Sequence, residues 1–207
     1  TPKQTPQLIT PSGGINLDEI KPESIFIGGP KRDWILTAQN NFARRLVLNS
    51  DNQWQVLDQF NAPESKARVV GAVNINLDGE PGDEIVLIDL GVQKLRILRK
   101  DANVYRPWKE VEIGEFPFLS AHVADLNGDQ LPDLVLFGRG QFGILYSGQT
   151  PPTLKDVASY ESKIPQAYFT DSVAGDLNSD GHSDVVILDL RTHQVEILNF
   201  QEQAGLK

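Results

Sequence analysis

Acidic and amide side chains recur at alternating positions in three short segments of the chain, residues 76–84, 125–133 and 176–184. Within each nine-residue segment, positions 1, 3 and 5 carry Asp, Asn or Glu, and position 9 carries Asp or Glu. Ca²⁺ prefers about six to eight oxygen ligands, and alternate positions of a tight loop can supply them. The pattern therefore predicts three calcium loops, each completed by a backbone carbonyl at position 7.

The predicted ligands follow the same order in every loop. They are Asn76, Asp78, Glu80, the carbonyl of Gly82 and Glu84 in the first loop, Asp125, Asn127, Asp129, the carbonyl of Leu131 and Asp133 in the second, and Asp176, Asn178, Asp180, the carbonyl of His182 and Asp184 in the third. Nine of these side chains are acidic, and like charges held this close repel one another without a cation. Three calcium ions would add +6 and change the formal net charge from −9 to −3.

The three loops are not equivalent at position 6, where a left-handed backbone is expected. Gly181 adopts it at no steric cost, Gln130 adopts it at some cost, and the φ angle of Pro81 is fixed at about −65°. We expect calcium affinity to fall in the order third, second, first, with two or three ions bound and the first loop empty or distorted. The alternative is that the loops are Asx turns without metal, because Asp and Asn favour turns.

The loops belong to a longer repeat, because each is followed at once by an apolar run, residues 85–88, 134–137 and 185–188. The residues at position 9 are 49 and 51 positions apart. Continuous apolar runs are typical of strands covered on both faces, and the alternating segments that follow are typical of half-exposed strands. Four short antiparallel strands in each repeat of about 50 residues predict an all-β fold made of β-propeller blades.

A fourth, degenerate repeat precedes the other three. Stepping back 51 positions from Glu84 reaches Asp33, which also precedes an apolar run. This alignment places Ile25, Ile27 and Gly29 at positions 1, 3 and 5, so we expect this repeat to bind no metal.

The domain organisation follows from the repeats. Residues 1–19 are rich in Pro and Gly and indicate a linker or arm, and residues 20–207 form the propeller, with blades at 20–60, 66–114, 118–162 and 168–207. The chain begins with Thr and contains no Met, which suggests a processed product or a fragment. We expect a ring of seven or eight blades, with the remaining blades supplied by sequence absent here or by a second copy. A closed four-bladed ring, completed by a strand from the arm, is the alternative.

At these residues the chain resembles the FG-GAP/VCBS repeat family, which includes the blades of integrin α-chain propellers. The resemblance covers residues 20–200 and rests on the recurring acidic loop followed by an apolar strand. It implies one calcium ion in each loop between the first two strands of a blade, and a role in adhesion or ligand binding. Some members of the family support enzymes.

Composition and the absence of motifs argue against several classes of function. The chain has 28 acidic and 19 basic residues and no Cys, so it lacks the basic character of a nucleic-acid binder and has no thiolate chemistry. No apolar run reaches the length of about 18 residues that a membrane span needs, and no catalytic motif is present.

We expect a non-catalytic calcium-binding module for a protein or glycan ligand, secreted, extracellular or periplasmic. The alternative is the propeller part of a carbohydrate-active enzyme such as a polysaccharide lyase. Trp54 and Trp108 are expected to pack between blades or, alternatively, to stack on a sugar ring. His122 is expected on an innermost strand, and the ring of His182 is expected to face solvent.

Overall fold

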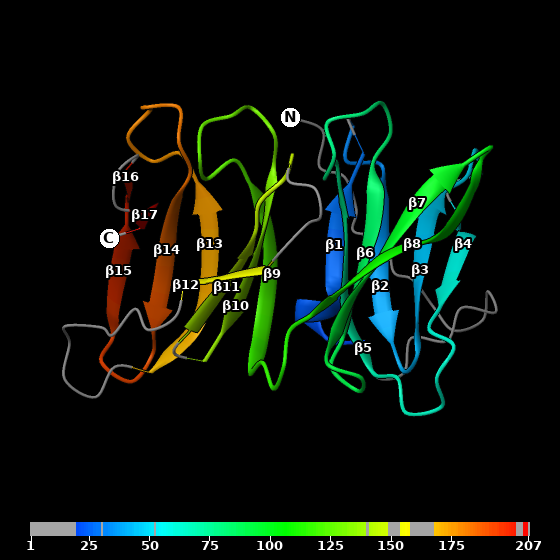
Figure 1. Cartoon of the computed structure of the whole chain (residues 1–207), viewed down its shortest axis with the longest axis horizontal. Coiled ribbons are helices and arrows are strands. Elements are labelled where there is room, and N and C mark those ends of the chain that lie inside the picture. Colours follow the sequence, from blue (N-terminus) through cyan, green and yellow to red (C-terminus); the bar gives the residue numbers. More distant parts are fainter. Residues whose placement is uncertain are drawn as a thin grey trace.

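The protein is all-β in a computed structural model that describes residues 20–29, 31–51, 53–139, 141–148, 154–157, 168–201 and 205–206. Four antiparallel sheets follow one another along the chain and stand side by side in Figure 1. The only helical element in this part of the chain is a 3-10 turn, η2 (Pro22–Ser24).

The strands are distributed over four blades. Blade 1 contains β1 (Ile25–Gly28), β2 (Trp34–Gln39), β3 (Phe42–Leu48) and β4 (Trp54–Asn61), and blade 2 contains β5 (Val69–Ile75), β6 (Glu84–Asp89), β7 (Lys94–Asp101) and β8 (Val104–Glu112). Blade 3 contains β9 (Phe118–Ala124), β10 (Asp133–Gly138), β11 (Gln141–Leu145) and β12 (Leu154–Val157), and blade 4 contains β13 (Phe169–Gly175), β14 (Asp184–Asp189) and β15 (Gln194–Leu198), followed by the hairpin of β16 (Phe200–Gln201) and β17 (Gly205–Leu206).

The strand order within each sheet equals the order along the chain, so consecutive strands pair as antiparallel hairpins. The first strands of successive blades are neighbours, since β5 contacts β9 and β9 contacts β13. This arrangement is that of propeller blades and confirms the fold class predicted from the repeats.

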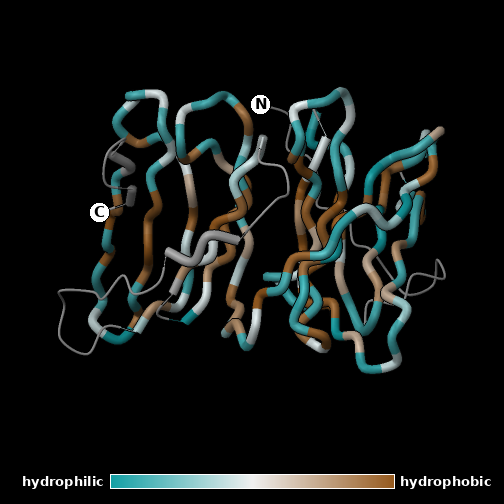
Figure 2. The backbone as a smooth tube through the Cα atoms, viewed as in Figure 1, coloured by the Kyte–Doolittle hydropathy of each residue, from teal (hydrophilic) through white to brown (hydrophobic). Residues whose placement is uncertain are grey.

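Apolar side chains fill the space between neighbouring blades. Figure 2 shows hydrophobic strands between two hydrophilic rims, where the chain turns. Every residue of β6 and of β10 is buried, because each of these strands is covered on both faces. Leu36 and Leu87 belong to the cluster between blades 1 and 2, Val86 and Leu136 to that between blades 2 and 3, and Val135 and Ile187 to that between blades 3 and 4.

One face of blade 4 is not covered by the described residues. Val173, Val186 and Ile197 are cross-strand neighbours on this face, and Val173 and Ile197 are 57% and 53% exposed. Their equivalents in blade 2, Val73 and Ile97, are 2% and 0% exposed, because blade 3 covers them. The outer face of blade 4 thus has the composition of a blade–blade interface.

The front repeat differs from its predicted alignment by one residue. The ladder pairs Gly28 with Trp34 in blade 1 and Ile75 with Glu84 in blade 2, so the equivalent of Glu84 is Trp34 and not Asp33. Ile25 and Ile27 lie in β1, and the connection to β2 has five residues (29–33) instead of eight (76–83). The alignment was wrong because it matched Asp33, the one acidic residue of this shorter loop, to Glu84, although Asp33 lies one residue before the equivalent position.

Candidate metal centres

The three acidic loops lie on the same rim of the blades, at the top of Figure 1. Each joins the first strand of a blade to the second: β5 to β6, β9 to β10 and β13 to β14. The structure therefore brings the predicted ligands of each loop together within one blade, at equivalent places in three successive blades.

The third loop is held by hydrogen bonds from its own backbone. The Oδ1 and Oδ2 atoms of Asp176 accept the N–H groups of Ser179 (2.6 Å) and Gly181 (3.1 Å). Asn178 accepts the N–H of Asp180 at 2.9 Å, and Asp180 accepts the N–H at position 7 at 2.9 Å. These bonds hold the side-chain oxygens of positions 1, 3 and 5 against backbone N–H groups of their own loop.

Asp184 closes the third loop at position 9 and is fully buried. Its Oδ2 accepts the N–H of Leu177 at 3.1 Å, whereas its Oδ1 has no hydrogen-bond donor among the residues that the structure describes. A buried carboxylate oxygen without a donor is costly. A divalent cation held by the loop would satisfy this oxygen, so the residues present fit a calcium ion.

The second loop repeats these contacts. Both oxygens of Asp125 accept backbone N–H groups, from Gly128 at 2.7 Å and from Gln130 at 2.9 Å. At position 9, Asp133 accepts the N–H groups of Leu126 at 3.0 Å and Ser147 at 2.9 Å.

Burial, together with the smaller effect of the nearby charges of Asp129 and Asp125, raises the pKa of Asp133 to about 6, although these two hydrogen bonds lower it. A bound cation would favour the ionised form. The side chain that we expect to ligate calcium is thus destabilised as an anion in the protein alone.

The backbone of the second and third loops matches the expectation for position 6. Gln130 has a φ of 71° and Gly181 a φ of 90°, both in the left-handed region. In the first loop, Pro81 cannot adopt this conformation, and the left-handed angle moves to Gly82, with a φ of 117°. The carbonyl at position 7 therefore follows a different backbone path in the first loop.

An arginine also occupies the first loop. Arg99, on β7, lies with its Nη2 2.7 Å from Oδ2 of Asp78 and its Nε 3.9 Å from Oε1 of Glu84. A guanidinium paired with the carboxylates of positions 3 and 9 competes with any cation there. Sequence reasoning missed Arg99, which lies two residues beyond Ile97, because only the strand pairing brings it to the loop.

Neighbouring loops touch through position 7 of one and position 4 of the other. The ring of His182 lies against Gly128, where a Cβ would come within 2.2 Å of the ring, and the side chain of Leu131 contacts Gly79 in the same way at 3.6 Å. The backbone N–H of Ser183 also donates to the carbonyl of Asp125 at 3.0 Å. The expectation that the His182 ring faces solvent was wrong, because the ring fills the space left by a glycine in the next loop.

No group of three or more His, Asp or Glu side chains within the described ranges is arranged closely enough to hold a metal ion. The reason lies in the hydrogen bonds above. The carboxylates of positions 1 and 5 are turned toward backbone N–H groups of their own loops, as in Asx turns.

Two buried aspartates that sequence reasoning did not single out accept backbone hydrogen bonds at the rim opposite the acidic loops. Asp89 accepts the N–H groups of Arg68 at 2.8 Å and Gly91 at 3.0 Å, and Asp189 accepts those of Tyr168 at 2.7 Å and Arg191 at 2.8 Å. Each one ties the turn after the second strand to the start of the first strand. Their sequence signal is an Asp-Leu pair that ends the apolar strand and recurs one hundred positions later.

The remaining candidates occupy the strands on which they were expected. His122 lies on the innermost strand β9, and its Nε2 is 3.0 Å from the Oγ of Ser120 and 3.1 Å from that of Ser172. Trp108 packs against the apolar cluster between blades 2 and 3, which favours the packing interpretation. Trp54 begins β4 and is half-buried.

Comparison with known proteins agrees with this architecture. Residues 125–187, which include the second and third loops, match the FG-GAP-like repeat family. The chain is thus similar to FG-GAP-like repeats over this part, and its successive antiparallel sheets are consistent with the blades of an FG-GAP-repeat propeller. No curated protein sequence matches the chain.

Two solved structures share the fold. A protein from Lactobacillus plantarum superimposes with a TM-score of 0.55 at 14% identity, over 86% of this chain and 54% of the other. A functionally unknown protein from Desulfotomaculum acetoxidans gives a TM-score of 0.55 at 18% identity, over 89% of this chain and 54% of the other. The chain thus spans about half the length of the structures that it matches.

Proposed function

We propose that the chain is a calcium-stabilised, non-catalytic part of a β-propeller that binds a protein or glycan ligand outside the cytoplasm. Calcium would act structurally, tying the first strand of a blade to the second and stabilising the folded state by mass action. The third and second loops would bind the ion, and the first would bind it weakly or not at all. Among the described residues, no helix is long and apolar enough to span a membrane.

The observation that carries the calcium proposal is the buried Oδ1 of Asp184, which has no donor among the described residues. The oxygens of Asp176, Asn178 and Asp180 lie in the same loop. A buried carboxylate oxygen without a donor is costly, and the loop supplies the oxygen ligands that calcium prefers.

Calcium titration of chelator-treated protein by calorimetry tests the proposal. We expect heat of binding and a rise in melting temperature, both reduced in Asp184→Asn. Asp51→Asn removes an exposed carboxylate in a turn of blade 1 and is the matched control. The absence of binding heat in the unmodified protein, or an equal loss in both variants, would contradict the proposal.

The uncovered face of blade 4 supports a larger ring. Val173, Leu188, Val195 and Ile197 are 57%, 37%, 57% and 53% exposed, although their equivalents in blade 2 are buried. We propose that a further blade of the same type covers this face in the complete protein. Light scattering should then show self-association of this chain through the bare face, and none when the chain is part of a longer native protein that carries more blades.

A second function has one observation in its favour. On the rim opposite the acidic loops, the guanidinium groups of Arg139 and Arg191 lie 5.0 and 4.9 Å from the ring centre of Tyr168. Cations around a tyrosine are what a lyase for acidic polysaccharides would need at one rim. Screening acidic polysaccharides for cleavage, with Tyr168→Phe as the comparison, separates this function from simple binding.

A further inference from the structure

A pocket of about 420 Å³ opens on the rim opposite the acidic loops. It is formed by the segment before β1, the turns after β2 and β6, and the starts of β5 and β9. Three blades therefore contribute to it. Its volume lies within the range of about 300–1,000 Å³ that is typical of small-molecule sites.

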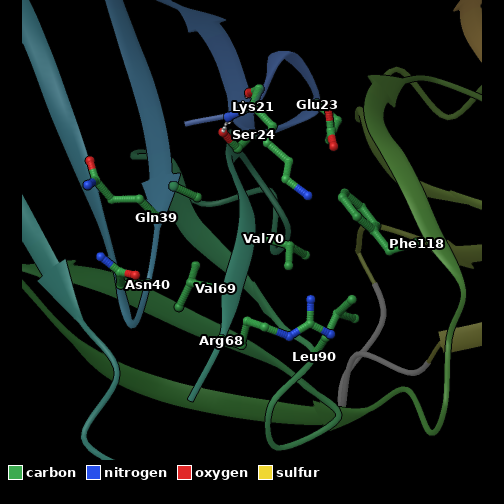
Figure 3. Close-up of a pocket in the computed structure, with 11 residues that line it drawn as sticks. Lys21, Glu23, Ser24, Gln39, Asn40, Arg68, Val69, Val70, Leu90 and Phe118 are labelled. Atoms are coloured by element: carbon green, nitrogen blue, oxygen red, sulfur yellow. Dashed lines mark hydrogen bonds between the residues drawn. The ribbon is translucent and has the colours of Figure 1, made fainter. Parts of the chain in front are cut away.

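Two cationic side chains reach into this pocket. Figure 3 shows Lys21 and Arg68 extending toward the same space, on either side of Val70. Neither side chain has an ion pair with a carboxylate in the part of the chain that the structure describes. Glu23 also lines the pocket, so its three charged side chains sum to +1.

Hydrogen bonds fix the backbone at both cationic residues. The N–H of Arg68 donates to Asp89 at 2.8 Å, and its carbonyl accepts the N–H of Leu90 at 3.0 Å. The backbone N–H of Lys21 donates to Oγ of Ser24 at 3.1 Å, and that hydroxyl donates to the Lys21 carbonyl at 2.7 Å. Fixed backbones reduce the conformational entropy that a ligand must overcome to engage these side chains.

The rest of the lining is largely apolar. Val70, Leu90 and Phe118 face the cations in Figure 3, and Val69 and Ala38 are buried at the floor. A ligand that fits must bring an apolar body to this wall and a negative charge to the cations. An inorganic anion would leave the wall uncovered, and a neutral apolar molecule would leave the two cations unpaired.

We propose that this pocket binds a monoanionic organic carboxylate with an apolar body, with Lys21 and Arg68 donating to the carboxylate and Phe118 packing on the body. The source is either a free carboxylic acid or the C-terminal residue of a peptide, since both present the same chemistry. This ligand class rests on the proposed binding function, but its recognition does not involve calcium.

The test measures binding of 3-phenylpropionate and of acetyl-Leu-Phe to the calcium-saturated chain by NMR titration. The amides of both compounds serve as uncharged controls. We expect each acid to bind at least tenfold more tightly than its amide, about the effect of losing one charge-assisted hydrogen bond. Tighter binding of the free acid or of the peptide identifies the source.

Arg68→Met and Lys21→Met keep the aliphatic stems and should each weaken acid binding about tenfold without changing amide binding. Lys100→Met removes an exposed charge from β7, outside the pocket, and should change neither. Equal binding of acid and amide, or equal effects of all three variants, would overturn the inference. Calcium binding is measured separately by calorimetry, so failure of one proposal is distinguishable from failure of the other.

Discussion

The imidazole of His182 in the third loop lies directly on Gly128 of the second loop, where a Cβ would come within 2.2 Å of the ring. The two candidate calcium loops are therefore in mechanical contact. A change in the backbone of one loop must displace a side chain of the other.

Gly128→Ala should destabilise the protein by more than the strain of its φ of 76° alone, because the added methyl group clashes with the ring of His182. We expect a loss of about 2–3 kcal/mol in the free energy of unfolding, measured by urea denaturation. Gly181→Ala is the matched control, because Gly181 also has a positive φ, of 90°, but a methyl group there would meet no atom within 4 Å among the described residues. Equal losses in the two variants would show that the contact between the loops does not contribute to the free energy of unfolding.

Arg99→Met should increase calcium binding by the first loop. The substitution removes the guanidinium that lies 2.7 Å from Asp78 and leaves two carboxylates without a cation. Calorimetry should then show either more calcium ions bound per chain or a higher affinity at the weakest site. Lys100→Met, which changes the adjacent residue, should leave the titration unchanged. An unchanged titration in Arg99→Met would mean that the backbone path around Pro81, and not the arginine, weakens this loop.

Ile97→Ala and Ile197→Ala alter equivalent residues of blades 2 and 4. Ile97 is 0% exposed and Ile197 is 53% exposed, so the first change should cost about 2–5 kcal/mol and the second about 0.5 kcal/mol or less. Urea denaturation of the two variants measures the difference. The comparison is made at a protein concentration at which sedimentation shows a monomer, and similar costs there would show that the face of blade 4 is covered within a single chain.

Protonation of His122 should make folding stability depend on pH. Burial lowers the pKa of this imidazole below its usual value, and the charge of Asp171 partly opposes that shift. The unfolded chain, with a pKa of about 6.5, therefore binds the proton more readily than the folded protein. The free energy of unfolding is therefore highest above about pH 6.5, where His122 is neutral in both states, and it decreases as the pH falls toward the pKa of His122 in the folded protein.

Unfolding free energies measured between mildly acidic and neutral pH should show this slope in the unmodified protein and a smaller one in His122→Gln. A slope that is unchanged by the substitution would assign the pH dependence to other groups.

The blade architecture could be predicted from sequence because the apolar second strands and the acidic loops recur at nearly constant spacing. The departure of the first loop at Pro81 and the left-handed angles of Gln130 and Gly181 follow from single-residue stereochemistry, and the structure has them. The front repeat was misaligned by one residue because its shorter loop carries a single acid, Asp33, which lies one residue before the position equivalent to Glu84.

Contacts between a loop and a strand that does not adjoin it in sequence, and contacts between blades, could not be predicted in the same way. The pairing of Arg99 with Asp78 depends on which residue of β7 lies beside the loop, and the packing of His182 on Gly128 depends on the stagger of two blades. The pocket around Lys21 and Arg68 combines segments from three blades. None of these relationships produces a sequence pattern that recurs from one repeat to the next.

The bare face of blade 4 has a consequence for how the chain loses its structure. In a row of units that touch only their neighbours, stability is a sum of unit and nearest-neighbour contributions. Blades 1 and 4, at the two ends of the row, each have one such contribution fewer than blades 2 and 3 among the described residues. Hydrogen exchange should therefore be faster in β15 than in β7 and β11, the equivalent strands of blades 2 and 3, and denaturation should begin at the end blades before it reaches the middle of the row.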